Sequence, residues 1–124
     1  MVNDAEAALE QFDIALRLGP RDADRWTIHT GIALTHFATE DYPGTIQAAA
    51  QASSLRPDAA FPYGTLAAAH ALLGNDAEAQ RALNRMCHFA PHTTLAGLEA
   101  IVASTNKDIA KRYIEGLKRA GLSN

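Results

Sequence analysis

Three stretches of this chain repeat one helical pattern, and each of them stops at a proline. They cover residues 8–20, 45–57 and 79–91, with small or apolar side chains every three or four positions. The terminal prolines lie 37 and then 34 residues apart. A period near 34 residues with helical spacing inside each unit is typical of a helical solenoid, in which each unit packs on its neighbours. We therefore expect stacked pairs of antiparallel helices.

The composition favours helices over a sheet. Hydrophobic residues make up 48% of the 124-residue chain, aromatic residues make up only 6%, and alanine supplies much of the apolar fraction. Alanine favours closely packed helices, whereas sheets favour β-branched and aromatic residues. We predict an all-α fold of seven helices in a single domain. Their expected ranges are about 3–18, 23–39, 43–55, 58–73, 76–89, 94–103 and 106–119.

Polar residues and glycines mark the expected helix ends. Asp22 and Asp58 are expected N-caps, because a short polar side chain can accept a hydrogen bond from the free N–H groups of the first turn. The spacing of a capping box occurs twice, at residues 75–78 and 105–108. Gly121 is expected to end the last helix.

The formal net charge of −3 argues against a general nucleic-acid-binding role. The charge is uneven: residues 1–60 carry a net charge of −5 and residues 105–124 carry +3. The last predicted helix has one apolar and one basic face, which suits a helix that covers the end of the core. We interpret the basic face as solvated rather than phosphate-binding. Its residues are Lys107, Lys111, Arg112, Lys118 and Arg119.

The remaining composition bears on the compartment. A single cysteine, Cys87, excludes an internal disulfide framework and fits a reducing compartment. No apolar run approaches the roughly 20 residues that a membrane-spanning helix needs, and no signal peptide is recognised. The expectation is a cytoplasmic chain without a membrane partner.

The segment 58–91 resembles one unit of the tetratricopeptide repeat (TPR) family, which consists of two antiparallel helices, A and B. The matching positions are Tyr63, Leu66, Ala67, His70, Ala79, Leu83, Met86 and Pro91. This resemblance implies a TPR-like solenoid with an orphan B helix at 1–20, repeats at 21–57 and 58–91, and a partial repeat with a C-terminal capping helix at 92–124. The repeat at 21–57 carries three extra residues, which implies a longer A helix or turn.

Residues 113–122 resemble the ending of TPR regions in bacterial multidomain proteins that carry an adenylate/guanylate cyclase domain or a winged-helix regulator domain. Together with the missing first A helix, this resemblance implies that the chain is the C-terminal piece of a larger bacterial signalling protein. Nothing in the sequence resembles a cyclase or winged-helix core. Neither activity is therefore assigned to these residues.

No residue pattern indicates catalysis, a cofactor or a metal. His29 and His36 lie seven residues apart, whereas zinc sites on helices favour a spacing of four with further ligands nearby. Cys87 and His88 are adjacent and diverge by about 100° around a helix, so they do not form a nucleophile–base pair. No glycine-rich nucleotide loop is present. We therefore expect the chain not to be an enzyme.

TPR arrays usually bind partners along their concave face, so the resemblance implies a protein- or peptide-binding groove. Its expected lining is Thr27, Thr30, Leu34, Phe37, Phe61, Thr65, Ala68 and Leu72. These side chains lack the charged clamp with which some family members hold a terminal carboxylate, so we expect a segment that binds by apolar burial. Two alternatives remain open. The region packs against its own upstream domain, or it is a small-ligand-sensing fragment of a multidomain enzyme.

The first predicted helix lacks its partner A helix. Its apolar residues Leu9, Phe12 and Leu16 are therefore expected to be partly uncovered. Because exposed apolar surface tends to mark an interaction site, we expect self-association as a homodimer through this helix, with two-fold symmetry.

Overall fold

The computed structural model describes residues 4–102 and 106–123. Within these residues all regular structure is helical and no strand is found. The helices are α1 (Asp4–Arg17), α2 (Asp22–Ala38), α3 (Tyr42–Leu55), α4 (Ala60–Leu72), α5 (Asp76–Phe89), α6 (Leu95–Val102) and α7 (Lys107–Ala120). The prediction of an all-α fold with seven helices is confirmed for this part of the chain, and every helix starts and ends within two residues of its predicted range.

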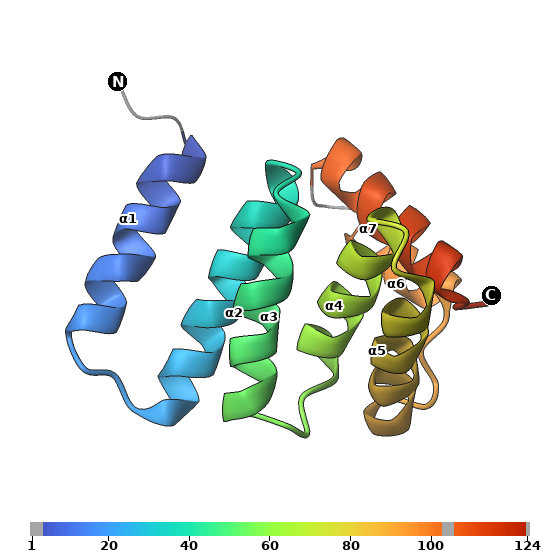
Figure 1. Ribbon diagram of the computed structural model, residues 1–124, viewed down its shortest axis with the longest axis horizontal. Coiled ribbons are helices and arrows are strands. Elements are labelled where there is room, and N and C mark those ends of the chain that lie inside the picture. The colour runs from blue at the N-terminus through green and yellow to red at the C-terminus, as the bar shows by residue number, and fades with distance from the viewer. Residues whose placement is uncertain (1–3, 103–105, 124) are drawn as a thin grey trace.

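Helices α1 to α5 lie side by side, and successive helices run in opposite directions (Figure 1). Each packs against the next one along the chain. Helix α7 departs from this row: it runs obliquely against α4 and also contacts α5 and α6 (Figure 1). The row therefore has α1 at one end, and α7 covers α4 near the other.

Alanine allows the helices of the row to approach closely. Ala49 and Ala52 of α3 and residues 67–69 of α4, all alanines, are almost fully buried. Short side chains bring two helix backbones nearer than leucine or phenylalanine would. The alanine-rich stretch of the sequence is thus used in contacts between α3 and α4.

Helix α7 comes into backbone contact with α4 at Gly116. A Cβ atom at this position would lie 2.7 Å from the carbonyl oxygen of Ala68 and 2.8 Å from its Cα atom, so no side chain fits there. Tyr113 and Leu117 of α7 lie on the same face and are buried in the main hydrophobic core with Phe37 of α2. Glycine at this one position lets α7 join the core.

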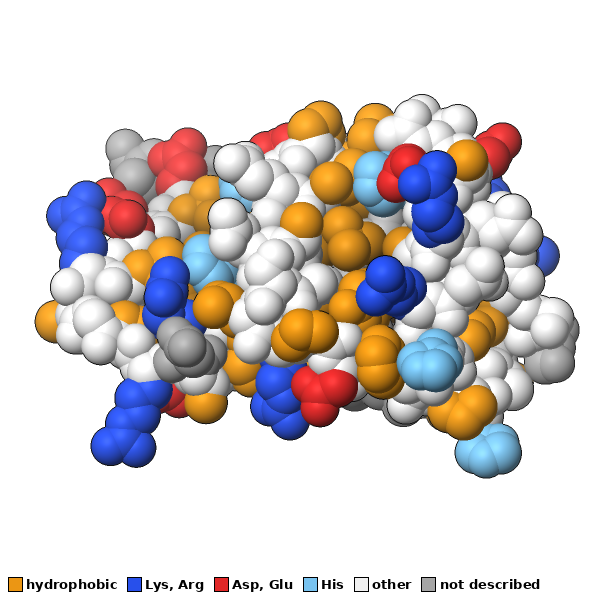
Figure 2. All heavy atoms as spheres, turned by 60° about the horizontal axis from the view of Figure 1, so that its bottom comes forward, with side chains coloured by type: hydrophobic (Ala, Val, Ile, Leu, Met, Phe, Trp, Pro, Cys, Tyr) orange, Lys and Arg blue, Asp and Glu red, His pale blue; other side chains and the backbone are white. Residues whose placement is uncertain are grey.

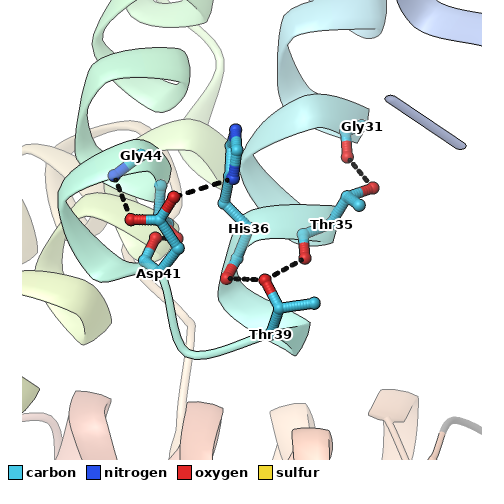
Figure 3. A network of polar contacts seen from close by, with 7 residues as sticks. Gly31, Thr35, His36, Thr39, Asp41 and Gly44 are labelled. Atoms are coloured by element: carbon cyan, nitrogen blue, oxygen red, sulfur yellow. Dashed lines mark hydrogen bonds and ion pairs between the residues drawn. The ribbon is translucent and has the colours of Figure 1, made fainter. Parts of the chain in front are cut away.

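A polar network fixes the turn between α2 and α3 (Figure 3). Asp41 is the N-cap of α3: its carboxylate accepts a hydrogen bond from the Gly44 N–H at 3.0 Å and lies 3.1 Å from Nδ1 of His36. The Thr39 hydroxyl donates to the carbonyl oxygens of Thr35 and His36. These contacts satisfy backbone groups at one helix C-terminus and one helix N-terminus.

Three predicted caps differ in the structure. Asp22 is the first residue of α2, and the N-cap is Arg21, which makes no capping bond through its side chain. Asp58 precedes the N-cap of α4 and accepts a hydrogen bond from Nε of Arg56 at 3.0 Å. Asn75 is the N-cap of α5, but its side chain makes no capping bond. For Asp22 and Asp58 a shift of one residue removes the cap, because only the N-cap side chain reaches the free N–H groups. Asn75 stands at the predicted position, but its amide nitrogen lies 3.3 Å from Nδ1 of His70 instead.

The ends of α7 are clearly defined. The predicted cap Thr105 lies outside the described residues, and the structure places Asn106 at the N-cap. Its side-chain oxygen accepts hydrogen bonds from the N–H groups of Asp108 and Ile109. At the other end, Gly121 adopts the left-handed conformation with φ of 117°, so the prediction that it ends the helix is confirmed.

One residue of the predicted basic face is not solvated. Arg112 is half-buried, and its guanidinium donates hydrogen bonds to the carbonyl oxygens of Phe37 at 2.8 Å and Ala38 at 2.9 Å. It also donates to the hydroxyl of Tyr42 at 3.1 Å. The last carbonyls of α2 lack partners within their own helix, and a cation near a helix C-terminus is favourable. The other four basic residues of α7 are exposed, as predicted.

Candidate functional site

Helix α7 fills the central part of the groove that the sequence predicted. Phe37, Thr65 and Ala68 are each no more than 1% exposed. Tyr113 of α7 lies among them: its ring centroid is 5.5 Å from that of Phe37, and its hydroxyl is 3.4 Å from the Thr65 hydroxyl. Phe61 is 45% exposed but stacks on Tyr113 at 6.2 Å. Burial raises the pKa of Tyr113 to about 12, so its hydroxyl stays protonated at neutral pH.

The other predicted groove residues lie elsewhere. Leu72 packs half-buried against the main core. The hydroxyls of Thr27 and Thr30 donate to carbonyls of their own helix. Leu34 lies in an open hollow between α1 and α2. In this structure the eight residues do not line one open groove, because α7 lies on α4.

Helix α1 is the least covered helix of the row. Leu9, Phe12 and Leu16 are half-buried, and the Phe12 ring lies against Gly31 of α2. None of the described residues of α1 is buried. Two exposed apolar residues on the other side of the helix were not predicted as part of an interaction surface. Ile14 is 50% exposed, and Leu18, which follows the last helical residue, is 81% exposed. A helical projection would have found Ile14, which lies about 200° from Phe12 around the axis.

A cleft that sequence analysis did not predict runs between α4 and α5. It has a volume of about 650 Å³. Figure 2 shows it as a hollow with a hydrophobic floor and basic side chains on its rim. The floor and walls combine aromatic, aliphatic, basic and histidine side chains. These are Tyr63, Leu66 and His70 of α4, and Glu78, Arg81, Ala82, Asn84, Arg85, His88 and Phe89 of α5.

The aromatic end of the cleft is rigidly built. The rings of Tyr63 and Phe89 stack with centroids 5.9 Å apart, and the His88 ring meets Phe89 edge-on at 4.8 Å. The Tyr63 hydroxyl donates a hydrogen bond to the carbonyl oxygen of Pro57 at 2.7 Å, which fixes the position of the Tyr63 ring. Aromatic pairs of this kind contribute about 0.5–1.5 kcal/mol beyond their buried area.

The polar end of the cleft contains a histidine whose charge is suppressed. Burial lowers the pKa of His70 below its ordinary value of 6.5, and the nearby carboxylate of Glu78 opposes this shift. Nδ1 of His70 lies 3.3 Å from the amide nitrogen of Asn75. Glu78 itself pairs with Arg81 at 3.0 Å in an exposed contact. A neutral imidazole therefore lies beside basic side chains at this end.

Comparisons with protein-family models, with curated proteins and with solved structures find no match to this chain. Function is therefore inferred from the geometry of α1 and of the α4–α5 cleft.

The described residues contain no group of three or more His, Cys, Asp or Glu side chains placed to hold a metal ion. Cys87 packs half-buried against the core, whereas the neighbouring His88 is exposed, so the two side chains point apart. Burial and, to a lesser degree, Arg25 lower the pKa of His29. Among the described helices, none has the length and hydrophobicity that a membrane crossing requires.

Proposed function

We propose that this chain is a non-catalytic protein–protein interaction module that assembles through α1. One observation carries the proposal: α1 packs on α2, none of its described residues is buried, and Ile14 and Leu18 are exposed to solvent. Apolar side chains grouped on an uncovered surface tend to mark a binding site.

The proposed occupant of this surface is a second copy of the chain. In a two-fold pair the same surface, with Ile14 and Leu18, lies on both sides of the interface, so one sequence supplies both partners. The charges of α1 support an antiparallel arrangement, because Asp4 and Glu6 lie in the first turn and Arg17 in the last. Arg17 pairs with Asp13 within its own helix at 2.7 Å, but both side chains are largely exposed, and such surface pairs exchange at little cost.

The sequence resemblances extend this proposal to the whole protein. A TPR-type region at the end of a bacterial signalling protein, downstream of a cyclase or winged-helix domain, would use α1 pairing to bring two upstream domains together. In this proposal the module is cytoplasmic, and its role is regulatory or oligomerising rather than chemical.

Cross-linking at a single position tests the pairing. In a Cys87→Ser background, Ile14→Cys is expected to give covalent dimers with a short bismaleimide linker, because the antiparallel register that places Arg17 beside Asp4 or Glu6 of the second copy leaves the two Ile14 positions only about 8–10 Å apart along the helix axis. Gln51→Cys, on the exposed side of α3, is the matched control and is expected to stay monomeric. Equal yields at both positions would indicate random collision and reject the proposal.

A small-ligand-sensing role is the second candidate, and the α4–α5 cleft favours it. Its volume of about 650 Å³ falls within the range of small-molecule sites, roughly 300–1,000 Å³. A ligand that raises the melting temperature of the monomeric protein, with no cross-linked dimer of Ile14→Cys, would favour this role over the module.

A further inference from the structure

We propose that the α4–α5 cleft binds an extended acidic segment of a partner protein, in which acidic and apolar residues alternate. The proposal deepens the interaction function by naming the chemistry of a partner. It rests on the role of the chain as a protein-binding module but not on pairing through α1, because the cleft and α1 lie on different helices.

The shape of the cleft suits a length of chain. Its lining on α5 extends from Glu78 to Phe89, which corresponds to about 16 Å along the helix axis. An extended chain of roughly five residues covers this distance. The cleft is a channel open to solvent along the helices, so a segment enters it from the side without threading (Figure 2).

The spacing of the two arginines fits alternating carboxylates. Arg81 and Arg85 are four residues apart on α5 and therefore about 6 Å apart along its axis. In an extended segment, side chains two residues apart point the same way and lie about 6.6 Å apart. Two such carboxylates reach both guanidinium groups. The residue between them then points to the cleft floor at Leu66 and Ala82.

The cations of the cleft are available to a ligand. The Arg85 side chain is exposed and makes no ion pair or hydrogen bond with the described residues. The pair between Arg81 and Glu78 is on the surface, with side chains 72% and 51% exposed. An exposed pair of this kind contributes at most about 1 kcal/mol and yields to a better placed carboxylate. The cleft therefore has an excess of positive charge, with two guanidinium groups and one carboxylate in its lining.

His70 adds a neutral donor at one end. When the Asn75 amide donates to Nδ1, the proton of the neutral ring lies on Nε2, which can donate to a ligand oxygen. At the other end, the stacked Tyr63 and Phe89 rings form an apolar wall for a second side chain. The donors are spread along an apolar channel rather than gathered around one point, which favours a peptide over a compact phosphate group.

Fluorescence anisotropy at low salt tests the proposal with a defined probe. The probe is a fluorescein-labelled seven-residue peptide of alternating glutamate and leucine. The control peptide has glutamine in place of glutamate. The whole chain is expected to bind the acidic peptide at least tenfold more tightly, and added salt is expected to weaken binding. Equal binding of the two peptides, or no binding of the acidic one, would overturn the proposal.

Variants locate the binding in the cleft. Arg85→Gln is expected to weaken binding of the acidic peptide about tenfold, the effect of one lost charge-assisted contact. Arg119→Gln, which removes an exposed arginine from α7, is the matched control and is expected to leave binding unchanged. An equal loss of affinity in both variants would mean that the peptide is attracted nonspecifically, and would contradict binding in the cleft.

Two further measurements separate this proposal from its alternatives. In an Ile14→Glu background, which disrupts pairing through α1, the acidic peptide is still expected to bind. Loss of peptide binding in this background would show that the cleft needs the dimer, and would overturn the claim that the cleft binds independently of α1. Pyrophosphate and a single-stranded oligonucleotide are the competing anions. If either anion binds more tightly than the peptide, and its binding is lost in Arg85→Gln, the cleft is a phosphate site and the proposal fails.

Discussion

Arg112 joins α7 to the turn between α2 and α3, which lies 70 to 75 residues earlier in the sequence. Its guanidinium binds the last two carbonyls of α2 and the hydroxyl of Tyr42 at the start of α3, and it lies over the Phe37 ring at 5.4 Å. The planar fork of arginine presents several donors in fixed directions, which a lysine ammonium cannot match. This one side chain ties α7 to the α2–α3 turn.

Removing the guanidinium group of Arg112 is expected to lower stability. Arg112→Ala should reduce the free energy of unfolding by about 1–3 kcal/mol, because hydrogen bonds from a charged donor are lost. Arg112→Lys should fall between the wild type and Arg112→Ala. Urea denaturation measures the effect. The neighbouring Lys111→Ala is the control, with an expected change within about 0.5 kcal/mol, because Lys111 is exposed. Similar stabilities for Arg112→Ala and Lys111→Ala would show that the hydrogen bonds of Arg112 do not contribute to the free energy of unfolding.

Single residues of this kind were the hardest to predict. Arg112 was assigned to a solvated face together with the other basic residues of α7, and the acceptors that hold it lie 70 to 75 residues away. Glu40 gave no signal either, although it adopts a left-handed conformation with φ of 63° in the turn before Asp41. Arg112 depends on tertiary contacts. Glu40 instead stands in a local helix-ending turn, with the Glu40 N–H bonded to the Phe37 carbonyl at 3.1 Å and the Asp41 N–H to that of His36 at 2.8 Å, but without the glycine that usually marks such a turn.

At the scale of elements, the helices were predictable and the place of α7 was not. Helix ranges follow from the local spacing of apolar residues and from Gly19, Gly74 and Gly121, all of which have positive φ. The position of α7 follows from the match between Gly116 and Ala68, which are 48 residues apart. The α4–α5 cleft was missed for a similar reason, because its lining comes from two helices.

Gly116→Ala tests whether close contact holds α7 on α4. A Cβ atom here would clash with the Ala68 backbone, which cannot move aside as a flexible side chain would. We expect the free energy of unfolding to fall by about 1–3 kcal/mol, the usual effect of overpacking, although alanine favours a helix over glycine by about 1 kcal/mol.

Gly97→Ala on α6 is the matched control. The nearest atom to its Cβ would be the Thr94 hydroxyl at 3.2 Å, a side-chain atom that can shift. This variant is expected to be neutral or slightly stabilising. If Gly116→Ala is as stable as Gly97→Ala, α7 does not depend on close approach to α4, and the account of the filled groove is contradicted.

At the scale of the whole molecule, the two ends of the row differ. Near one end α7 covers α4, so part of the surface that the sequence assigned to a partner is buried within the chain. At the other end α1 packs on α2 and has no buried residue among those described. The proposed pairing through α1 follows from this asymmetry, whereas the proposed binding of an acidic segment follows from the cleft between α4 and α5.

Sedimentation equilibrium over a range of concentrations tests the proposed assembly most directly. We expect the wild type to shift from monomer to dimer as concentration rises, and Leu18→Glu to remain monomeric with unchanged helical circular dichroism. Gln51→Glu adds the same charge on α3 and should dimerise like the wild type. A wild type that stays monomeric at the highest concentration, or a Leu18→Glu variant that dimerises equally well, would contradict the account.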